Sequence, residues 1–211
     1  MKLAVFDFDG TLLRGNSWHC FFRWQLRTRP LSGPGLLAAL AARRIRLLSA
    51  RALQERVLRA WRGWTQAQVA QAGERWYHRT IAPILRPAGL QEIARCRAEG
   101  FEPVVLSGAF DFLIRPFAEN HKIARCRGTR LEYKTEIFTG HLLEEALTGE
   151  AKVAALASMI AGETVDWAES RAYGDEPGDL PVLRQVGHPC WVRTRRRLPA
   201  GLPASCRLVE W

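Results

Sequence analysis

The spacing of hydrophobic positions changes along the chain and divides it into three regions. The first is a short apolar run at Lys2–Phe8, which has the length and composition of a buried strand. In the second, from about Ser17 to Arg79, apolar residues recur at helical spacing, with an interruption at Gly63. Within it, Thr65-Gln66-Ala67-Gln68 has the form of a capping box at a helix start. This pattern predicts one strand followed by several helices.

The third region, from about residue 83 onward, alternates between helical and extended segments. Strands that alternate with helices form a mostly parallel sheet, so this region predicts an α/β fold with helices flanking the sheet. The helical second region is then an insertion after the first strand. The last stretch, residues 195–211, has no pattern that predicts an element. We expect helices at 88–99, 111–120, 149–160 and from 179, strands at 103–106, 123–125, 171–174 and 188–192, and paired strands at 131–133 and 136–138.

Composition narrows the class of protein. A chain of 211 residues with 47% hydrophobic and 25% charged residues suits one soluble α/β domain, or a core domain with a modest insertion. We expect no membrane span, because no apolar run approaches about 20 residues. The start of the chain does not have the form of a signal peptide. Five scattered cysteines without CxxC spacing favour the reducing cytoplasm and argue against a zinc site or a disulfide framework.

The positive charge of the chain is concentrated in the helical region. Eleven arginines and a single acid, Glu55, lie between Arg14 and Arg62, so this segment carries the whole net charge of +10. Such a segment is either a solvated helix surface or a surface that meets anions. The sequence leaves both interpretations open.

Two carboxylates follow the first strand at once. Asp7 and Asp9 are two positions apart, so on an extended chain they face the same side, and Gly10 provides a turn directly after them. Ligands of open α/β sheets bind beyond the carboxyl ends of the strands, where these side chains are expected. Two carboxylates repel each other there unless a cation or a proton intervenes. The alternative is an ordinary acidic turn after an edge strand.

Three other segments carry candidate chemistry. Ser107 and Gly108 are expected to end the strand at 103–106, where a hydroxyl and a bare backbone N–H can hold phosphoryl oxygens, or they form a plain turn. Lys152, near the start of a predicted helix, either neutralises a bound phosphate or is a solvated helix lysine. Asp175 and Asp179 lie on either side of a turn after a strand. They suit a metal site, and Asp179 also suits a helix N-cap.

The segments DFDGTL, LSGAF, GEAK and YGDEPGDLP occur in this order along the chain. They resemble the four motifs of the haloacid dehalogenase superfamily, in particular its subfamily IB, the phosphoserine-phosphatase-like branch. The resemblance runs from residue 2 to about residue 193. It implies a Rossmann-like core domain formed by residues 1–13 and 80–211, with a helical cap domain inserted at residues 14–79.

The resemblance further implies a Mg²⁺-dependent phosphatase. Asp7 would attack phosphorus and form an aspartyl-phosphate, and Asp9 would protonate the leaving oxygen and then activate water. The carboxylate of Asp9 favours phosphoester hydrolysis over the reactions of family members that have no carboxylate at this position. The implied metal ligands are Asp7, the backbone carbonyl of Asp9 and Asp175, with Asp179 in support, and the implied phosphate-binding groups are Ser107, Gly108 and Lys152.

The substrate is less defined by the sequence. Phosphoserine enzymes of this branch carry a Glu nine positions after the nucleophile, and this chain has the neutral Asn16 there, which argues against phosphoserine. Trp18, His19 and Arg23 follow on the first predicted helix of the cap and are candidates for lining the entrance, or they are ordinary packing and surface residues. A small phosphorylated metabolite is the expected substrate.

Two other functions remain open. Related bacterial phosphatidylglycerophosphate phosphatases also carry a basic, leucine-rich insertion, so the segment with Arg43, Arg44, Arg46 and Arg51 is a candidate for docking on an anionic membrane at the cytoplasmic face. The same leucines would also serve as the core of a helical cap. A non-catalytic module that binds phosphate or nucleic acid is the third possibility. We expect no nucleic-acid partner, because aromatic and basic residues of the insertion do not alternate as in a base-stacking platform.

Overall fold

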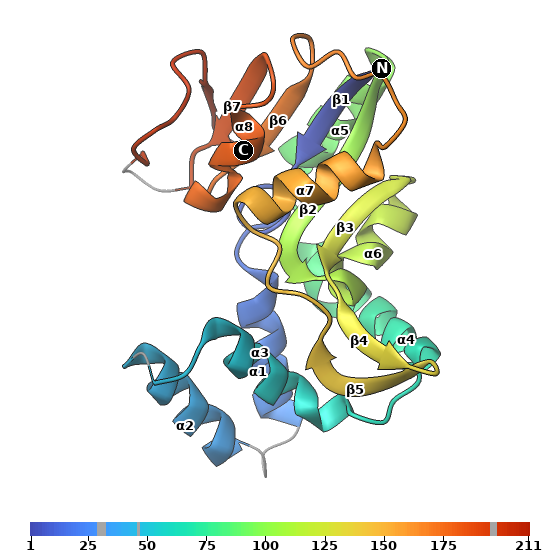
Figure 1. Cartoon of the computed structure of the whole chain (residues 1–211), viewed down its shortest axis with the longest axis vertical. Helices are drawn as coiled ribbons and strands as arrows, with labels where there is room; N and C mark the ends of the chain where they lie inside the picture. Colours follow the sequence, from blue (N-terminus) through green and yellow to red (C-terminus); the bar gives the residue numbers. More distant parts are fainter. Residues whose placement is uncertain (29–32, 46, 195–197) are drawn as a thin grey trace.

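The computed structural model describes residues 1–28, 33–45, 47–194 and 198–211, and in these residues the main sheet has six strands, all parallel (Figure 1). The strand order is β3-β2-β1-β6-β7-β8, so the first strand lies near the middle. This confirms the predicted α/β class with a mostly parallel sheet. The strands are β1 Lys2–Phe6, β2 Phe101–Phe110, β3 Arg125–Thr129, β6 Arg171–Gly174, β7 His188–Val192 and β8 Arg207–Val209.

Helices cover both faces of this sheet: α5 Pro87–Ala98, α6 Asp111–Asn120, α7 Glu150–Met159 and α8 Leu180–Leu183. Alternation along β1 decides which side chain meets which layer. Ala4 and Phe6 belong to the hydrophobic cluster that includes α5 and α6. Leu3 and Val5 belong to the separate cluster that includes α7 and α8. By the same alternation, Asp7, two residues after Val5, is directed toward the layer formed by α7 and α8.

A second body of helices and strands, which we call the helical lobe, lies at the other end of the molecule from the upper part of the sheet (Figure 1). Trp61 is fully enclosed there, within ring-contact distance of Phe21 and Phe112. The capping box predicted at Thr65 and Gln68 is confirmed. The lobe comprises α1 Ser17–Thr28, α2 Gly33–Arg44, α3 Ala50–Leu58, α4 Gln66–Trp76, β4 Leu131–Lys134 and β5 Ile137–Leu142, with the short turns η2 Arg59–Trp61, η3 Tyr77–Ile81 and η4 Ala82–Ile84 leading on.

The β4–β5 hairpin is bonded to the helical segment although the two are far apart in the sequence. The backbone N–H of Gly63 donates to the Phe138 carbonyl at 2.9 Å, and the Phe138 N–H donates to the Trp64 carbonyl at 2.8 Å. The N–H of Gln66 donates to the Glu136 carbonyl at 2.8 Å. The helical lobe thus contains two separate stretches of chain joined by backbone hydrogen bonds. None of the helices in the described ranges combines the length and the apolar content that a bilayer crossing requires.

Several local expectations differ from the structure. The strand expected at 123–125 begins only at Arg125 and runs to Thr129, because the N–H of Ile123 is still bonded to the Ala118 carbonyl at the end of α6. The strand expected at 136–138 continues to Leu142, because it pairs with β4 along that length.

Ser107 and Gly108 do not end the strand expected at 103–106, because β2 continues to Phe110 and pairs with β3 again there after a register shift. The tail, for which no element was expected, adds β8 beside β7. Its last residue, Trp211, has its ring 5.5 Å from that of Tyr173 and accepts a hydrogen bond from Arg86.

Gly73 allows α4 to approach α6 closely, which generates a first prediction. A Cβ at this position would lie 2.2 Å from the backbone oxygen of Phe112. Replacing Gly by Ala inside a helix normally stabilises it by about 1 kcal/mol. Here the clash dominates, and we expect Gly73→Ala to lower the free energy of unfolding by about 1–3 kcal/mol.

Urea unfolding of both proteins measures this difference. Gly35→Ala is the matched control, because a Cβ there would meet its nearest atom, on Arg56, at an ordinary 3.6 Å. The control should be unchanged or stabilised by up to about 1 kcal/mol. Equal effects of the two substitutions would contradict the close helix contact.

Candidate active site

The acidic side chains of the first and fourth motifs meet at the carboxyl edge of the sheet. Asp7 follows β1, Asp175 follows β6, and these two strands are parallel neighbours. Asp179 closes the short turn η5, Pro177–Asp179. One carboxylate oxygen from each of the three residues lies within 4.8 Å of the others. The sequence positions of these carboxylates are far apart, and the sheet brings them to one point.

Lys152 joins two of these carboxylates. Alternation along β1 directs Asp7 toward the α7 layer, and Lys152 lies in the first turn of α7. Its Nζ donates to Asp7 Oδ1 at 2.5 Å and to Asp179 Oδ1 at 2.6 Å. Burial alone would lower the pKa of Lys152, but the two carboxylates raise it above its ordinary value, so the ammonium is charged at neutral pH. Burial raises the pKa of Asp7, and Lys152 opposes that rise.

Asp9 is held by the start of α1. Its Oδ1 accepts from the backbone N–H of Ser17 at 2.8 Å, and its Oδ2 accepts from the Ser17 hydroxyl at 2.9 Å. Burial raises the pKa of Asp9 to about 6, while the two bonds from Ser17 act in the opposite direction. A carboxyl that titrates near neutral pH can both give and accept a proton at that pH. Ser17 is fully buried, and its role was missed by the sequence reasoning, although its place at a helix start eight residues after Asp9 is a usable signal.

Asp175 and Asp179, the two aspartates of the fourth motif, have different hydrogen-bond partners. Asp179 Oδ2 accepts from the backbone N–H groups of Asp175 and Glu176, each at 3.0 Å, while its Oδ1 accepts from Lys152. Asp175 accepts from the hydroxyls of Thr11 at 3.2 Å and Thr194 at 3.0 Å. Burial, together with the neighbouring Asp179, raises the pKa of Asp175 to about 6. Asp179 is therefore the more fully engaged carboxylate and orients the turn.

The donor set fits a hard divalent cation. Lys152 is paired with Asp7 and Asp179. The third buried carboxylate, Asp175, accepts among the described residues only from the two threonine hydroxyls, so negative charge exceeds the charge of the ammonium at this point. All the candidate ligand atoms are oxygens, the type that Mg²⁺ prefers. Gly10 makes this crowding feasible, because it has φ +81° and a Cβ there would lie 2.2 Å from Asp175 Oδ2. The glycine of the first motif thus leaves the space that the carboxylate of the fourth motif fills.

A cavity of about 230 Å³ opens beside the carboxylates. Ser107 and Gly108 line it from β2, next to Lys152 and Asp179. Ser107 is buried, and its Oγ accepts from the backbone N–H of Ala109 at 3.1 Å. That bond leaves the hydroxyl hydrogen available to an oxygen in the cavity. The residues predicted to bind phosphate are therefore brought together with the residues predicted to act on it.

The helical lobe supplies the other wall of this cavity. Asn16 and Trp18 line it as the sequence suggested, whereas the side chains of His19 and Arg23 are exposed and are not among its lining residues. Gln54 of α3 also lines it and was missed. No local sequence signal marks Gln54, because its approach depends on how α3 packs in three dimensions.

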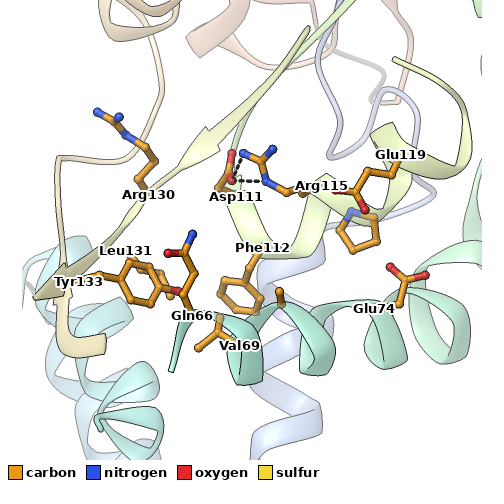
Figure 2. Close-up of a pocket in the computed structure, with 12 residues that line it drawn as sticks. Gln66, Val69, Glu74, Asp111, Phe112, Arg115, Glu119, Arg130, Leu131 and Tyr133 are labelled. Atoms are coloured by element: carbon orange, nitrogen blue, oxygen red, sulfur yellow. Dashed lines mark hydrogen bonds and ion pairs between the residues drawn. The ribbon is translucent and has the colours of Figure 1, made fainter. Parts of the chain in front are cut away.

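A larger cavity lies away from these residues. It measures about 520 Å³ and lies between α4, α6 and β4, as Figure 2 shows. Both of its arginines are paired: Arg115 bonds to Asp111 at 2.7 Å, and Arg130 bonds to Glu144 outside the cavity. It contains none of the motif carboxylates. Size alone would favour this cavity, but the convergent charged groups lie in the smaller one.

Known proteins resemble this chain in sequence and in fold. A family model for haloacid dehalogenase-like hydrolases matches residues 4–184. A probable phosphatase of Mycobacterium tuberculosis is 26% identical over 201 residues, which cover 92% of this chain and 70% of that protein. A protein of unknown function from Bordetella pertussis has a similar solved structure, with TM-score 0.76, 22% identity and coverage of 90% and 89%. A substrate-bound phosphoserine phosphatase has TM-score 0.65, 19% identity and coverage of 98% and 92%.

The raised pKa of Asp9 predicts how stability depends on pH in the metal-free protein. The Asp9 carboxyl has a pKa of about 6 in the folded protein and an ordinary value of 3.8, which we take for the unfolded chain. It therefore binds its proton more tightly in the folded state. As a result, this group costs no stability below about pH 4, destabilises the fold increasingly as pH rises from about 4 to about 6, and destabilises it by a constant amount above about pH 6. We expect Asp9→Asn to be more stable than wild type at about pH 8, by up to about 3 kcal/mol, and to lose that advantage near pH 4.

Urea unfolding with EDTA at both pH values checks this. Glu169→Gln, which removes an exposed carboxylate outside the site, controls for the loss of one negative charge. An Asp9→Asn difference that stays constant across the pH range would contradict the assignment.

Proposed function

The chain belongs to the haloacid dehalogenase-like hydrolase family, and from that membership we propose that it is a Mg²⁺-dependent phosphomonoester hydrolase. The observation that carries the proposal is the bridge from Lys152 to Asp7 and Asp179 beside Asp175, at the mouth of a small cavity. A nucleophilic carboxylate, an ammonium and an acidic metal site are the groups that phosphoryl transfer requires. They argue for turnover rather than for a module that only binds phosphate.

In the proposed mechanism Asp7 is the nucleophile. A carboxylate oxygen of Asp7 attacks phosphorus, the bond to the leaving oxygen breaks, and an aspartyl-phosphate forms on Asp7. Asp9 gives its proton to the leaving oxygen and then accepts one from the water that hydrolyses the intermediate. The pKa of about 6 for Asp9 suits this exchange of roles near neutral pH. Ser107, the Gly108 N–H and Lys152 hold the phosphoryl oxygens.

Mg²⁺ would be held by the Asp7 and Asp175 carboxylates and the backbone carbonyl of Asp9. When bound, it neutralises charge on the phosphoryl oxygens. Asp179 keeps this set in place through the backbone N–H groups of Asp175 and Glu176 and through Lys152.

The domain assignment follows the same logic. We propose a core domain of residues 1–13 and 80–211 and a cap domain of residues 14–79 that forms the substrate entrance. Support comes from Asn16, Trp18 and Gln54, which line the cavity from the helical side. The β4–β5 hairpin falls within the core range of the sequence but packs with the cap segment as part of the helical lobe. We also propose a cytoplasmic location, which the five free cysteines of the structure support.

A second candidate function is hydrolysis of an anionic lipid phosphate at a membrane surface. It is supported by α2 and the loop after it, where Leu37, Leu40 and Leu47 are 54%, 42% and 77% exposed, next to the exposed Arg43 and Arg44. Arg46 lies outside the described residues. Other apolar residues of the insertion, such as Leu53 and Leu58, are buried in the lobe, and Arg51 forms ion pairs with Glu55 and Glu145. Only the α2 part of the basic segment therefore suits membrane docking.

The lipid candidate predicts binding of the protein to anionic vesicles. We expect co-sedimentation with phosphatidylglycerol vesicles that persists in part at high salt, because leucines as well as charges would insert. Leu37→Gln with Leu40→Gln should weaken binding, by about tenfold for the two side chains. Vesicles of phosphatidylcholine are the control. Activity on soluble monoesters without any vesicle binding would remove this candidate.

The phosphatase proposal predicts Mg²⁺-dependent release of phosphate from p-nitrophenyl phosphate. EDTA should abolish the activity. Asp7→Asn, which keeps the shape and removes the nucleophile, should lower kcat by about 1,000-fold or more. Asp166→Asn, outside the site, is the matched control and should retain wild-type activity. If wild type and Asp7→Asn show the same background rate, the protein is not this enzyme.

A further inference from the structure

The wall of the cavity nearest the leaving group is formed by uncharged residues. Asp9, the proposed acid for the leaving oxygen, is bonded to Ser17. The leaving group therefore lies beside the neighbours of Ser17 in the chain, Asn16 and Trp18, and across from Gln54 of α3. These three residues offer two amides and an indole ring.

Charge at this end disfavours an ionised leaving group. Of the residues that line the cavity within the described ranges, Lys152 is the only cation, and it is bound to Asp7 and Asp179. A carboxylate on the substrate would enter without a counter-ion, which is costly in a partly buried site. Glu176 at the rim would repel it further. On the helical wall, the two amides and the indole supply no carboxylate that would pair with an ammonium group. Glu176 could attract an ammonium, but it is exposed at the rim, where solvent weakens such a pair.

The two amides are arranged for hydroxyl groups. Gln54 lines the cavity, and its Oε1 is buried and has no hydrogen-bond partner among the described residues. Because water does not reach this oxygen, the side chain must turn slightly for Oε1 to accept from a group in the cavity. Asn16 Oδ1 accepts from the backbone N–H of His19 at 3.1 Å, which directs the Nδ2 donor of Asn16 elsewhere. One unsatisfied acceptor and one donor suit a hydroxyl, which can donate and accept at the same time. A buried amide oxygen without a partner costs about 1–3 kcal/mol, and a substrate hydroxyl would recover that cost.

Trp18 limits the size and shape of the substrate. Its ring is fixed edge-on against Phe110, at 5.7 Å and 87°, and tilted against Phe22 at 5.9 Å. A fixed indole provides an apolar surface for a short carbon chain. The volume of about 230 Å³ is smaller than the range of about 300–1,000 Å³ typical of sites for drug-sized ligands.

We infer that the substrate is a phosphomonoester of a small, uncharged, hydroxyl-bearing alcohol such as a polyol, and that Gln54 is a specificity-determining residue for it. The inference rests on the proposed phosphatase function and deepens it. The same chemistry could be presented by a free polyol phosphate or by the terminal phosphoglycerol of a lipid.

Three-carbon and two-carbon phosphomonoesters that differ in charge test the inference. We expect kcat/KM for glycerol 3-phosphate to exceed that for phosphoserine, 3-phosphoglycerate and phosphoethanolamine by about tenfold or more. Equal or higher kcat/KM for any of the charged compounds would overturn it. Phosphatidylglycerophosphate in detergent, assayed in parallel, distinguishes the lipid source from the free one. If p-nitrophenyl phosphate is not hydrolysed either, the proposed function itself has failed.

Variants at Gln54 separate recognition from structure. Gln54→Met, similar in shape without hydrogen bonds, should raise KM for glycerol 3-phosphate by about tenfold and change kcat less. Gln54→Glu should raise the ratio of kcat/KM for phosphoethanolamine to that for glycerol 3-phosphate by about tenfold, because the new carboxylate pairs with the ammonium. Gln71→Met, on the exposed surface of α4, is the matched control. If Gln54→Met lowers kcat/KM equally for glycerol 3-phosphate and p-nitrophenyl phosphate, Gln54 is only structural and the inference is wrong.

Discussion

The ammonium of Lys152 is the charge on which the arrangement of the site depends. Asp7, Asp175 and Asp179 are 7%, 6% and 5% exposed, so their mutual repulsion is poorly screened by water. Lys152, itself 4% exposed, binds Asp7 and Asp179 and fixes the start of α7 over the ends of β1 and β6. The order of the parallel strands places the carboxylates close together, and their repulsion destabilises that arrangement. The positive charge of Lys152 offsets this repulsion.

The second carboxylate of the first motif connects the sheet to the helical lobe. Asp9 leaves the sheet edge and accepts both the backbone and the side-chain hydrogen bond of Ser17, the first residue of α1. The same bonds that shape the pKa of Asp9 therefore orient the first helix of the lobe. Asn16 and Trp18, on either side of Ser17, are placed in the cavity as a result. Acid-base chemistry and substrate recognition share this short segment of chain.

Much of this could be predicted from the sequence because the signals are local. The alternation along β1, the residues within each of the four motifs and the capping box at Thr65 each depend on residues that are near one another in the chain. Other features depend on tertiary partners. The strand β2 runs through Ser107 and Gly108 because pairing with β3 outweighs the turn preference of these residues. The tail forms β8 by pairing with the edge of β7, a partner from outside the tail. Gln54 enters the cavity through the packing of α3, which no short-range pattern encodes.

The backbone bonds between the β4–β5 hairpin and residues 63–66 have a mechanical consequence. Any tilt of the helices relative to the sheet must carry the hairpin along, so the lobe moves as one piece. Its connections to the sheet include the segment from Asp9 to Asn16 and the segment with Leu147 and Thr148, and all four residues line the cavity. The segments that join the lobe to the sheet therefore also line the reaction centre. Any change in the position of the lobe would act directly on Asp9, through its two bonds to Ser17, and on the wall that faces the substrate.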